Sequence, residues 1–267
     1  MLSQAHTFYA RSCHASLRSY TMCAVLVRLM VLVALAPRSS SARFRGSAIA
    51  SMASMHTPKT AARRQDASPS CRATPSPEQQ LQGIVLDALC QKLGSAKFLV
   101  FGSGHDSPFW VASNPDGTTR FLERHKDWID LQPEHVKALT TAVAYTSKLS
   151  EARDRVNDVS MLQQFYQDQL PEDLKNTLWD QILVDSPEGF SPSNPGRGQS
   201  IYAAKQLAHA GTVIFVDDCN RDVERLYIEK WLLQDGRKLK EYDNGHGGKT
   251  CRISSVLESG PSQGFRA

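Results

Sequence analysis

Residues 98–110, FLVFGSGHDSPFW, place two glycines and three polar side chains directly after an apolar run. Gly102 and Gly104 carry no Cβ, so a turn built on them lets the backbone approach a bound nucleoside closely. The next apolar run ends on Glu123, at the spacing where a carboxylate accepts hydrogen bonds from ribose hydroxyls. The pattern predicts a nucleoside-containing cofactor. The residues predicted to bind it are Gly102, Gly104, His105, Asp106, Ser107 and Glu123.

The same glycine pattern bears on the choice of cofactor. The dinucleotide fingerprint G-x-G-x-x-G uses its third glycine to pack a helix against the strand, and here Ser107 holds that place. A cofactor without a pyrophosphate has less need of the third glycine. The sequence therefore favours S-adenosylmethionine, with an NAD-dependent oxidoreductase as an alternative.

Acidic residues also end other apolar runs. Asp185 ends one of them, and Asp217 and Asp218 end another. Ligands of open α/β sheets bind at the carboxyl ends of the strands, so these acids are expected to share a crevice with Glu123. A single aspartate in such a place is often only a helix cap. Acids at several strand ends favour a functional site.

The order of elements indicates the sheet that positions these residues. Apolar runs typical of buried parallel strands lie at 97–102, 118–123, 141–146, 180–185 and 212–217. Helices are expected from Ser76 to Gly94 and near 107–114, 125–130, 159–168, 199–210 and 221–235. Strands that alternate with helices imply a parallel sheet covered on both faces.

The last elements of the chain differ from this pattern. Residues 238–243 and 249–257 predict a hairpin, because the turn between them opens with Asn-Gly. An α/β sheet closed by an antiparallel C-terminal hairpin is the layout of class I S-adenosylmethionine-dependent methyltransferases. We therefore predict an α/β, Rossmann-like fold of that class, with a mostly parallel seven-stranded sheet.

Charge separates an N-terminal leader from the rest of the chain. Residues 1–65 contain nine basic and no acidic residues, whereas residues 66–267 contain 22 basic and 27 acidic ones. This acidic body disfavours a nucleic-acid partner, which needs a basic face. Within the leader, residues 22–37 are too short for a full membrane span but suit a secretory signal or a signal-anchor. The abundance of Arg, Ser and Ala leaves a plastid transit peptide as an alternative.

These shifts in composition predict the domain organisation. A signal, anchor or transit leader is expected over 1–65, and a Ser/Pro linker over 66–76. The methyltransferase domain is expected over 77–258, followed by a flexible tail over 259–267.

The cysteines do not predict a scaffold held together by disulfide bonds. Of six, three fall in the leader and linker, which leaves Cys90, Cys219 and Cys251 in the domain. An odd number without C-x-x-C spacing argues against a disulfide framework and a zinc site. Cys219 is expected to be a small buried thiol.

Four sequence blocks together resemble the plant glucuronoxylan 4-O-methyltransferase family. They are VFGSGHDSPFW, FLERHKDWI, WDQILVDSPEGFSPSNPGRGQSIYAA and VIFVDDCNRDVERLYIEKWL. The resemblance runs from about Gly83 to Tyr242 in the same order. It implies an S-adenosylmethionine-dependent enzyme that methylates O4 of glucuronic acid side chains on xylan or on arabinogalactan glycans. It also implies anchoring in the Golgi lumen, which the leader fits.

Methylation of a sugar hydroxyl requires in-line attack on the sulfonium methyl group and removal of the hydroxyl proton. Asp185 is the first candidate base, although a helix cap would also explain it. Asp218 is a second candidate, and the two carboxylates together are a candidate site for a divalent metal ion. His105 is the third candidate, since imidazole titrates near neutral pH, unless it only shapes the cofactor loop.

An acidic acceptor needs a positively charged partner. Arg197, in the loop sequence NPGRG, is expected to bind the acceptor carboxylate, because a guanidinium can bind both carboxylate oxygens. Arg221 is a second candidate, although an ion pair within its helix explains it equally well. Trp110 and Trp128 are expected in the core.

The expected partner is therefore a polysaccharide or uronic-acid glycan, with no nucleic acid and membrane contact only through a retained leader. The alternative from another class is a non-catalytic polysaccharide-biosynthesis protein that keeps the fold. That alternative requires Asp185 to be held in a helix cap and the crevice to be filled.

Overall fold

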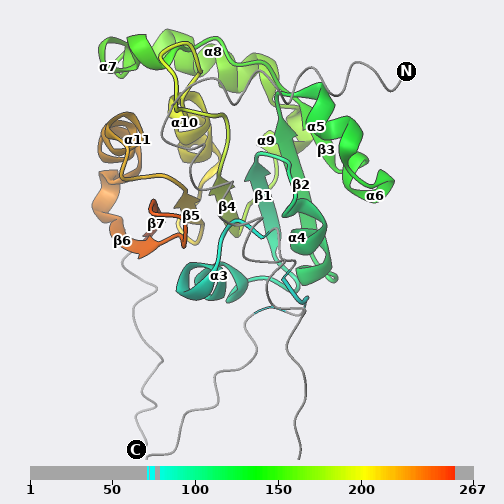
Figure 1. Cartoon of the computed structure of the whole chain (residues 1–267). Helices are drawn as coiled ribbons and strands as arrows, with labels where there is room; N and C mark the ends of the chain where they lie inside the picture. The colour runs from blue at the N-terminus through cyan, green and yellow to red at the C-terminus, as the bar shows by residue number, and fades with distance from the viewer. Residues whose placement is uncertain (1–70, 72, 76–78, 256–267) are drawn as a thin grey trace, which may run out of the picture. The chain divides into compact units, whose positions relative to one another are not determined.

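The computed structural model describes residues 71, 73–75 and 79–255, and the structural statements below concern these residues (Figure 1). Seven strands form one sheet in the order β3-β2-β1-β4-β5-β7-β6. They are β1 (Lys97–Phe101), β2 (Thr118–Glu123), β3 (Thr140–Ala142), β4 (Gln181–Val184), β5 (Val213–Val216), β6 (Lys238–Asp243) and β7 (Lys249–Ser254). Strands β1 to β5 pair in parallel, and β7 pairs antiparallel with β5 and β6. The predicted sheet and its C-terminal hairpin are confirmed.

The central strands are apolar on both sides because helices cover both faces of the sheet. Every residue of β4 and β5 is buried. The edge strand β6 differs, since its exposed positions include Lys238, Lys240 and Glu241. Charges on an edge strand discourage pairing with another chain.

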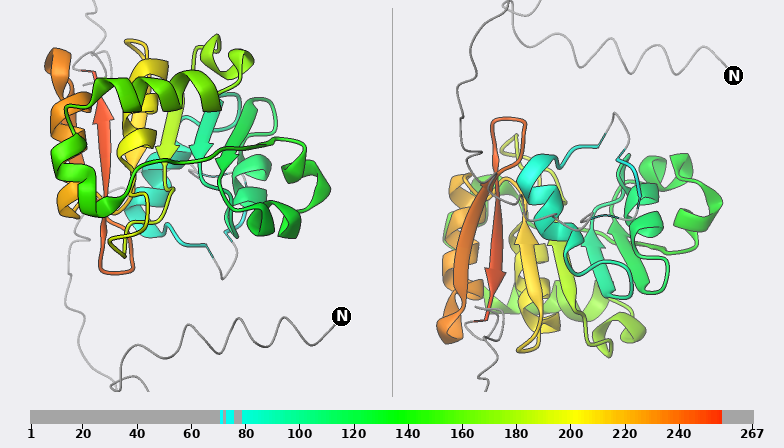
Figure 2. Two further views of the ribbon diagram at one scale, coloured as in Figure 1. Left: turned by 90° about the horizontal axis from the view of Figure 1, so that it is seen from above. Right: turned by 90° about the horizontal axis from the view of Figure 1, so that it is seen from below.

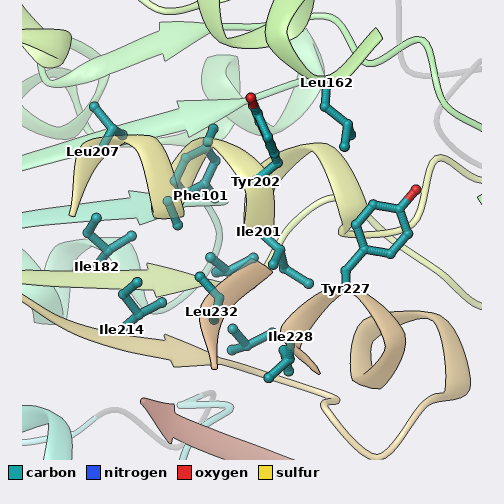
Figure 3. Packing of buried hydrophobic residues seen from close by; sticks show 14 of the residues in the cluster. Phe101, Leu162, Ile182, Ile201, Tyr202, Leu207, Ile214, Tyr227, Ile228 and Leu232 are labelled. Carbon is teal, nitrogen blue, oxygen red and sulfur yellow. The ribbon is translucent and has the colours of Figure 1, made fainter. Parts of the chain in front are cut away.

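Two helical layers enclose the sheet (Figure 2). One layer contains α7 (Ala152–Arg155), α8 (Val159–Gln169), α9 (Glu172–Lys175), α10 (Gly198–Leu207) and α11 (Asp222–Tyr227), which continues as a π-helical turn, Ile228–Leu232. The other layer contains α3 (Gly83–Cys90), α4 (Ser107–Ser113) and α6 (Glu134–Lys137). The short α5 (Lys126–Leu131) follows β2. In the first layer, Ile201 of α10 and Tyr227 of α11 belong to the same buried cluster as Ile182 and Ile214 of the sheet (Figure 3).

Several predicted boundaries are wrong. The helix expected from Ser76 begins at Gly83, because Gln82 is extended and Gly83 has a φ of +60°. The strand expected over 141–146 ends at Ala142. Beyond it the N–H of Ala144 donates to the Gln169 side chain instead of to a neighbouring strand. The helix expected over 221–235 divides into α11, the π-helical turn and a 3-10 turn, Gln234–Gly236.

The expectation of no disulfides is also wrong. Cys219 is bonded to Cys251, with 5.8 Å between their Cα atoms, and both residues are fully buried. Cys71, assigned to the linker, is bonded to Cys90 of α3. The pairing cannot be inferred from the sequence, because the partners lie 32 and 19 residues apart and are brought together only by the fold.

Among the helices of the described residues, none has the length and apolar character needed to cross a membrane. The apolar stretch 22–37, like the rest of the leader and the tail over 259–267, lies outside the described residues.

Candidate functional site

The carboxyl ends of the parallel strands bring the predicted site together. Phe101 is level with Leu122 on one side and with Val184 on the other, and Val184 is level with Val216. The residues that follow on these four strands, Gly102, Glu123, Asp185 and Asp217, therefore leave the sheet side by side. Such an edge is where ligands of open α/β sheets bind.

The loop after β1 contains one glycine with close neighbouring atoms and one glycine that borders open space. Gly102 has a φ of +123°, and a Cβ there would lie 3.1 Å from the Cβ of Ser186. A Cβ on Gly104 would have no heavy atom within 4 Å. The N–H of Gly104 donates to the Ser107 hydroxyl at 3.0 Å, which turns the loop into α4. The loop thus has a fixed backbone with open space above Gly104.

Glu123 is held rigidly at the end of β2. Its side chain is 3% exposed, and its two oxygens accept hydrogen bonds from the N–H groups of Ser103 (2.9 Å) and His125 (2.7 Å). A carboxylate offers about four acceptor positions. The residue therefore retains capacity for ribose hydroxyls, and the site fits a nucleoside.

Two of the predicted loop residues have other surroundings than expected. Both oxygens of Asp106 accept from the N–H of Gln80, at 3.1 and 3.2 Å, so Asp106 anchors the segment before α3. Burial raises the pKa of Asp106 to about 6. His105 is exposed, and its ring lies edge-on to the ring of Trp128 at 5.3 Å.

The tryptophan predictions have a mixed outcome. Trp110 is buried in the core, as expected. Trp128 is 38% exposed, so its assignment to the core is wrong. Helix α5 buries none of its residues, and Trp128 instead contacts His105 of the predicted cofactor loop.

Arg197 lies among three aspartates. Its Nη2 is 3.1 Å from Asp185 Oδ1 and 3.0 Å from Asp218 Oδ2, and its Nη1 is 3.6 Å from Asp217 Oδ2. Nη1 also donates to the carbonyl oxygen of Asp217. The side chain is only 5% exposed. We expected Arg197 to reach an acceptor carboxylate from an open loop, but in this structure the guanidinium neutralises acids of the protein itself.

Burial and the short distances between these charged groups shift the pKa values of Asp185 and Arg197. Burial raises the pKa of Asp185 well above its ordinary value, the charge of Arg197 opposes this, and Asp217 adds to the rise. Burial would lower the pKa of Arg197, but the nearby carboxylates outweigh that effect and raise it. Asp185 still has 24% of its side chain accessible, so a substrate hydroxyl can reach it.

Asp218 is positioned by an unusual backbone conformation. Its φ of +54° lies in the left-handed region, which is uncommon for residues other than glycine. Its Oδ2 accepts from both Arg197 and Arg221, the latter at 2.8 Å. Arg221 thus pairs with an acid of the site three residues before it, and 35% of its side chain remains accessible.

The arrangement does not fit a metal ion between Asp185 and Asp218. The guanidinium of Arg197 binds both carboxylates and occupies the position that a cation would need. No group of three or more His, Cys, Asp or Glu side chains in the described part of the chain is arranged to hold a metal ion.

Sequence reasoning missed three ionisable residues near the strand ends. Arg124 Nη1 donates to Glu188 Oε1 at 2.6 Å, and His125 Nε2 lies 3.4 Å from Glu188 Oε2. The signal was present in the sequence, because two basic residues directly follow Glu123 and Glu188 closely follows Asp185. Their mutual contact was not predictable without the sheet order.

A separate groove of about 530 Å³ lies between α8 and the segment 144–146. Its lining is largely polar and includes Thr146, Gln164 and Asp168. None of the predicted site residues lines it, so it is distinct from the crevice.

The sheet order, the reversed last strand and the glycine loop beside an acid at the end of β2 define a class I S-adenosylmethionine-dependent methyltransferase fold. Within that class the chain belongs to the IRX15/IRX15L/GXM family, whose family model matches residues 83–244. The resemblance inferred from the four sequence blocks is confirmed.

Individual relatives show how far the similarity extends. Arabinogalactan O-methyltransferase 2 of Arabidopsis thaliana is 33% identical over 185 residues, which cover 59% of this chain and 62% of that protein. Glucuronoxylan 4-O-methyltransferase 1 of the same plant is 33% identical over 187 residues, covering 62% and 66%. The chain thus spans less than two thirds of either relative. The solved structure of a precorrin-6Y C5,15-methyltransferase from Geobacter metallireducens is 14% identical, with a TM-score of 0.44. The match covers 67% of this chain and 90% of that protein.

Proposed function

We propose that this protein transfers a methyl group from S-adenosylmethionine to a sugar hydroxyl, namely O4 of a glucuronic acid in a polysaccharide. The observation that carries the proposal is one crevice containing Glu123, the open space above Gly104 and the accessible carboxylate of Asp185. The first two suit a nucleoside, and the third suits a base. The names of the relatives, both polysaccharide O-methyltransferases, support the reaction class.

In this proposal Glu123 accepts hydrogen bonds from the ribose hydroxyls, and the backbone at Gly102 and Gly104 borders the nucleoside. When bound, S-adenosylmethionine supplies an electrophilic methyl group on a positively charged sulfur. The protein then has to hold the acceptor hydroxyl and remove its proton.

Asp185 would accept that proton as the sugar oxygen bonds to the methyl carbon, and the sulfur–methyl bond would break to leave S-adenosylhomocysteine. The raised pKa of Asp185 makes its ionised form a stronger base, and Arg197 orients the carboxylate through Oδ1. Asp218 is less suited, because one of its oxygens already accepts from two guanidinium groups. The exposed imidazole of His105 is the alternative base.

Calorimetric titration of the full chain with S-adenosylhomocysteine and, separately, with NAD tests the cofactor. We expect S-adenosylhomocysteine to bind and NAD not to bind. Glu123→Ala should weaken the binding at least about tenfold, because hydrogen bonds to a charged acceptor are lost. Binding of NAD alone would favour the oxidoreductase, and binding of neither would refute an enzyme of this type.

Transfer of labelled methyl groups to glucuronoxylan, arabinogalactan and carboxyl-reduced glucuronoxylan tests the acceptor. We expect label on O4 of glucuronic acid in the first and none in the reduced polymer. Asp185→Asn should lower kcat by about 10²–10⁴-fold with S-adenosylhomocysteine binding retained. Full activity of Asp185→Asn would show that Asp185 is not the base. His105 would then be the candidate base, and the variant His105→Gln tests it.

A non-catalytic role is the competing proposal. Asp185 hydrogen-bonds Arg197 rather than a helix N-terminus, and the space above Gly104 is open. Both observations support the catalytic proposal over the non-catalytic one.

We further propose that the domain works in the lumen of the secretory pathway, in the Golgi. Support comes from the two disulfides, because such bonds persist in oxidising compartments. Microscopy of a C-terminal fluorescent fusion of the full chain tests this. A plastid signal would contradict the proposal and favour the transit-peptide alternative.

A further inference from the structure

The side chains of Arg124 and His125 hold a carboxylate from two sides. The guanidinium donates to one oxygen of Glu188 at 2.6 Å, and the imidazole Nε2 lies 3.4 Å from the other oxygen. We call these two basic side chains the carboxylate cradle. Each oxygen of the bound group has its own basic partner, an arrangement that any carboxylate of similar size can use.

The cradle connects the carboxyl ends of two strands. Arg124 and His125 follow the end of β2, and Glu188 follows the end of β4, while β1 lies between these two strands in the sheet. The Arg124–Glu188 bridge therefore joins the two sides of the glycine loop that leaves β1. The cradle adjoins Glu123 directly, and Glu188 lies three residues beyond Asp185.

The backbone that carries the cradle is fixed, whereas the side chains are accessible. The N–H of His125 donates to Glu123 Oε1 at 2.7 Å. The accessible fractions are 28% for Arg124, 44% for His125 and 23% for Glu188. Glu188 Oε1 also accepts a hydrogen bond from the Asn194 side chain at 3.3 Å, so a ligand carboxylate that replaces Glu188 has to break that contact as well as the ion pair. Partly exposed ion pairs contribute little net stability, which keeps the cost of the ion-pair exchange small.

The other arginines at the strand ends already pair with aspartates, so the cradle is the position best suited to an acidic ligand. Arg197 is enclosed by three aspartates, and Arg221 pairs with Asp218. Arg124 and His125 instead share a single carboxylate, which belongs to the loop after β4. A ligand carboxylate in place of Glu188 gives Arg124 and His125 the same countercharge, provided that the displaced Glu188 side chain turns into solvent.

We propose that the carboxylate cradle binds the carboxylate of a uronic-acid acceptor, and that Glu188 occupies the cradle until the acceptor arrives. The inference rests on the proposed function for the identity of the acidic sugar. It assigns Arg124 and His125 to acceptor specificity, a role that sequence reasoning gave to Arg197. It also makes Glu188 an internal competitor of the substrate.

Two substitutions in the same ion pair should act in opposite directions. Glu188→Gln removes the competing charge, so the full chain should bind methyl glucuronoside several-fold more tightly than the wild type. Arg124→Gln removes half of the cradle and should weaken that binding about tenfold or more. Isothermal titration in the presence of saturating S-adenosylhomocysteine measures both, with neutral methyl glucoside as the control ligand.

Arg120→Gln is the matched control variant. Arg120 lies on β2, the strand that precedes the cradle, and pairs with Asp173 through a partly exposed bridge. Its substitution should leave the affinity for methyl glucuronoside unchanged. Thermal unfolding of each variant verifies folding, and His125→Gln replaces Arg124→Gln if the latter fails to fold.

Weaker binding in both Glu188→Gln and Arg124→Gln would make the bridge a structural contact and overturn the proposal. Equal binding of the charged and neutral sugars, or no binding by wild type and Glu188→Gln, would overturn it as well. The proposed function has its own readout, because methyl transfer is measured separately and the sugar affinities of the variants are compared at one fixed concentration of S-adenosylhomocysteine. Opposite shifts in a protein without transferase activity would support the cradle and refute the enzyme.

Discussion

At the scale of single residues, Arg197 has the strongest influence on the charge of the site. Its guanidinium contacts Asp185, Asp217 and Asp218 while only 5% of its side chain is exposed. Without it, three partly buried carboxylates would face one another with no counterion from Arg197. Attraction within the cluster holds the loop 188–197 against the strand ends and leaves Asp185 oriented but accessible.

Arg197→Gln should therefore destabilise the fold by about 3 kcal/mol, because breaking a buried pair leaves uncompensated charges. Urea unfolding measures the change. Arg153→Gln is the control, since the exposed Arg153–Asp222 bridge should contribute less than about 1 kcal/mol. Similar losses in the two variants would contradict the importance assigned to the cluster.

The raised pKa of Asp106 predicts a specific dependence of the unfolding free energy on pH. Its pKa is about 6 in the folded protein and 3.8 in the unfolded chain, mainly because of burial. Between these values the unfolded chain releases the proton first, so the free energy of unfolding falls as the pH rises from about 4 to 6. The fall from this group is about 3 kcal/mol.

Asp106→Asn cannot titrate and should lack this component. The difference in unfolding free energy between wild type and variant, measured by urea titration from about pH 4 to 7, should change by about 3 kcal/mol. A difference that stays constant over this range would show that Asp106 does not titrate there.

At the scale of elements, the two glycines of the loop after β1 have different roles. Gly102 needs its positive φ and passes close to Ser186, whereas Gly104 borders open space. The first role concerns the fold, and the second concerns the ligand. Substitution by alanine distinguishes them.

Gly104→Ala should change stability by less than about 1 kcal/mol but weaken S-adenosylhomocysteine binding at least about tenfold, since the methyl group enters the proposed nucleoside space. Gly102→Ala should instead destabilise the fold by about 1–3 kcal/mol through backbone strain. Thermal unfolding and calorimetric titration of both variants give the comparison. Undiminished binding by Gly104→Ala would place the nucleoside elsewhere.

At the scale of the whole molecule, the C-terminal hairpin is tied to the crevice. Cys219 follows Asp217 and Asp218, and its bond to Cys251 joins their loop to β7. Asp217 Oδ1 also accepts from Thr250 at 2.7 Å and from Asn244 at 3.2 Å. The hairpin therefore supports the acidic side of the site as well as closing the sheet.

Replacing both Cys219 and Cys251 by serine should lower the free energy of unfolding by about 2–4 kcal/mol, because the unfolded chain gains freedom. Chemical unfolding of the variant and of the wild type measures this. Under strong reductant the wild type should lose at least as much, because the Cys71–Cys90 bond is broken as well. No difference between wild type and variant would mean that the bond does not form in solution.

Much of the fold follows from local sequence. Apolar runs of strand length, separated by helical periods, specify β1, β2, β4 and β5 to within about two residues because burial on both faces permits few other residue types. The Asn-Gly turn specified the hairpin. The start of α3 was misplaced because Gln82 is extended and Gly83 has a positive φ, which the helical spacing of apolar residues does not reveal. The end of β3 was misplaced because the N–H of Ala144 donates to the side chain of Gln169, a residue distant in sequence.

The sequence by itself determined the fold class, the family and the glycine loop with Glu123, because each depends on residue type and spacing along the chain. Only the tertiary structure decided which charges meet. It paired Arg197 with three aspartates, Glu188 with Arg124, and Cys219 with Cys251. The physical reason is that ion pairs and disulfides depend on distances of a few ångströms between side chains, and the order of strands in the sheet sets those distances.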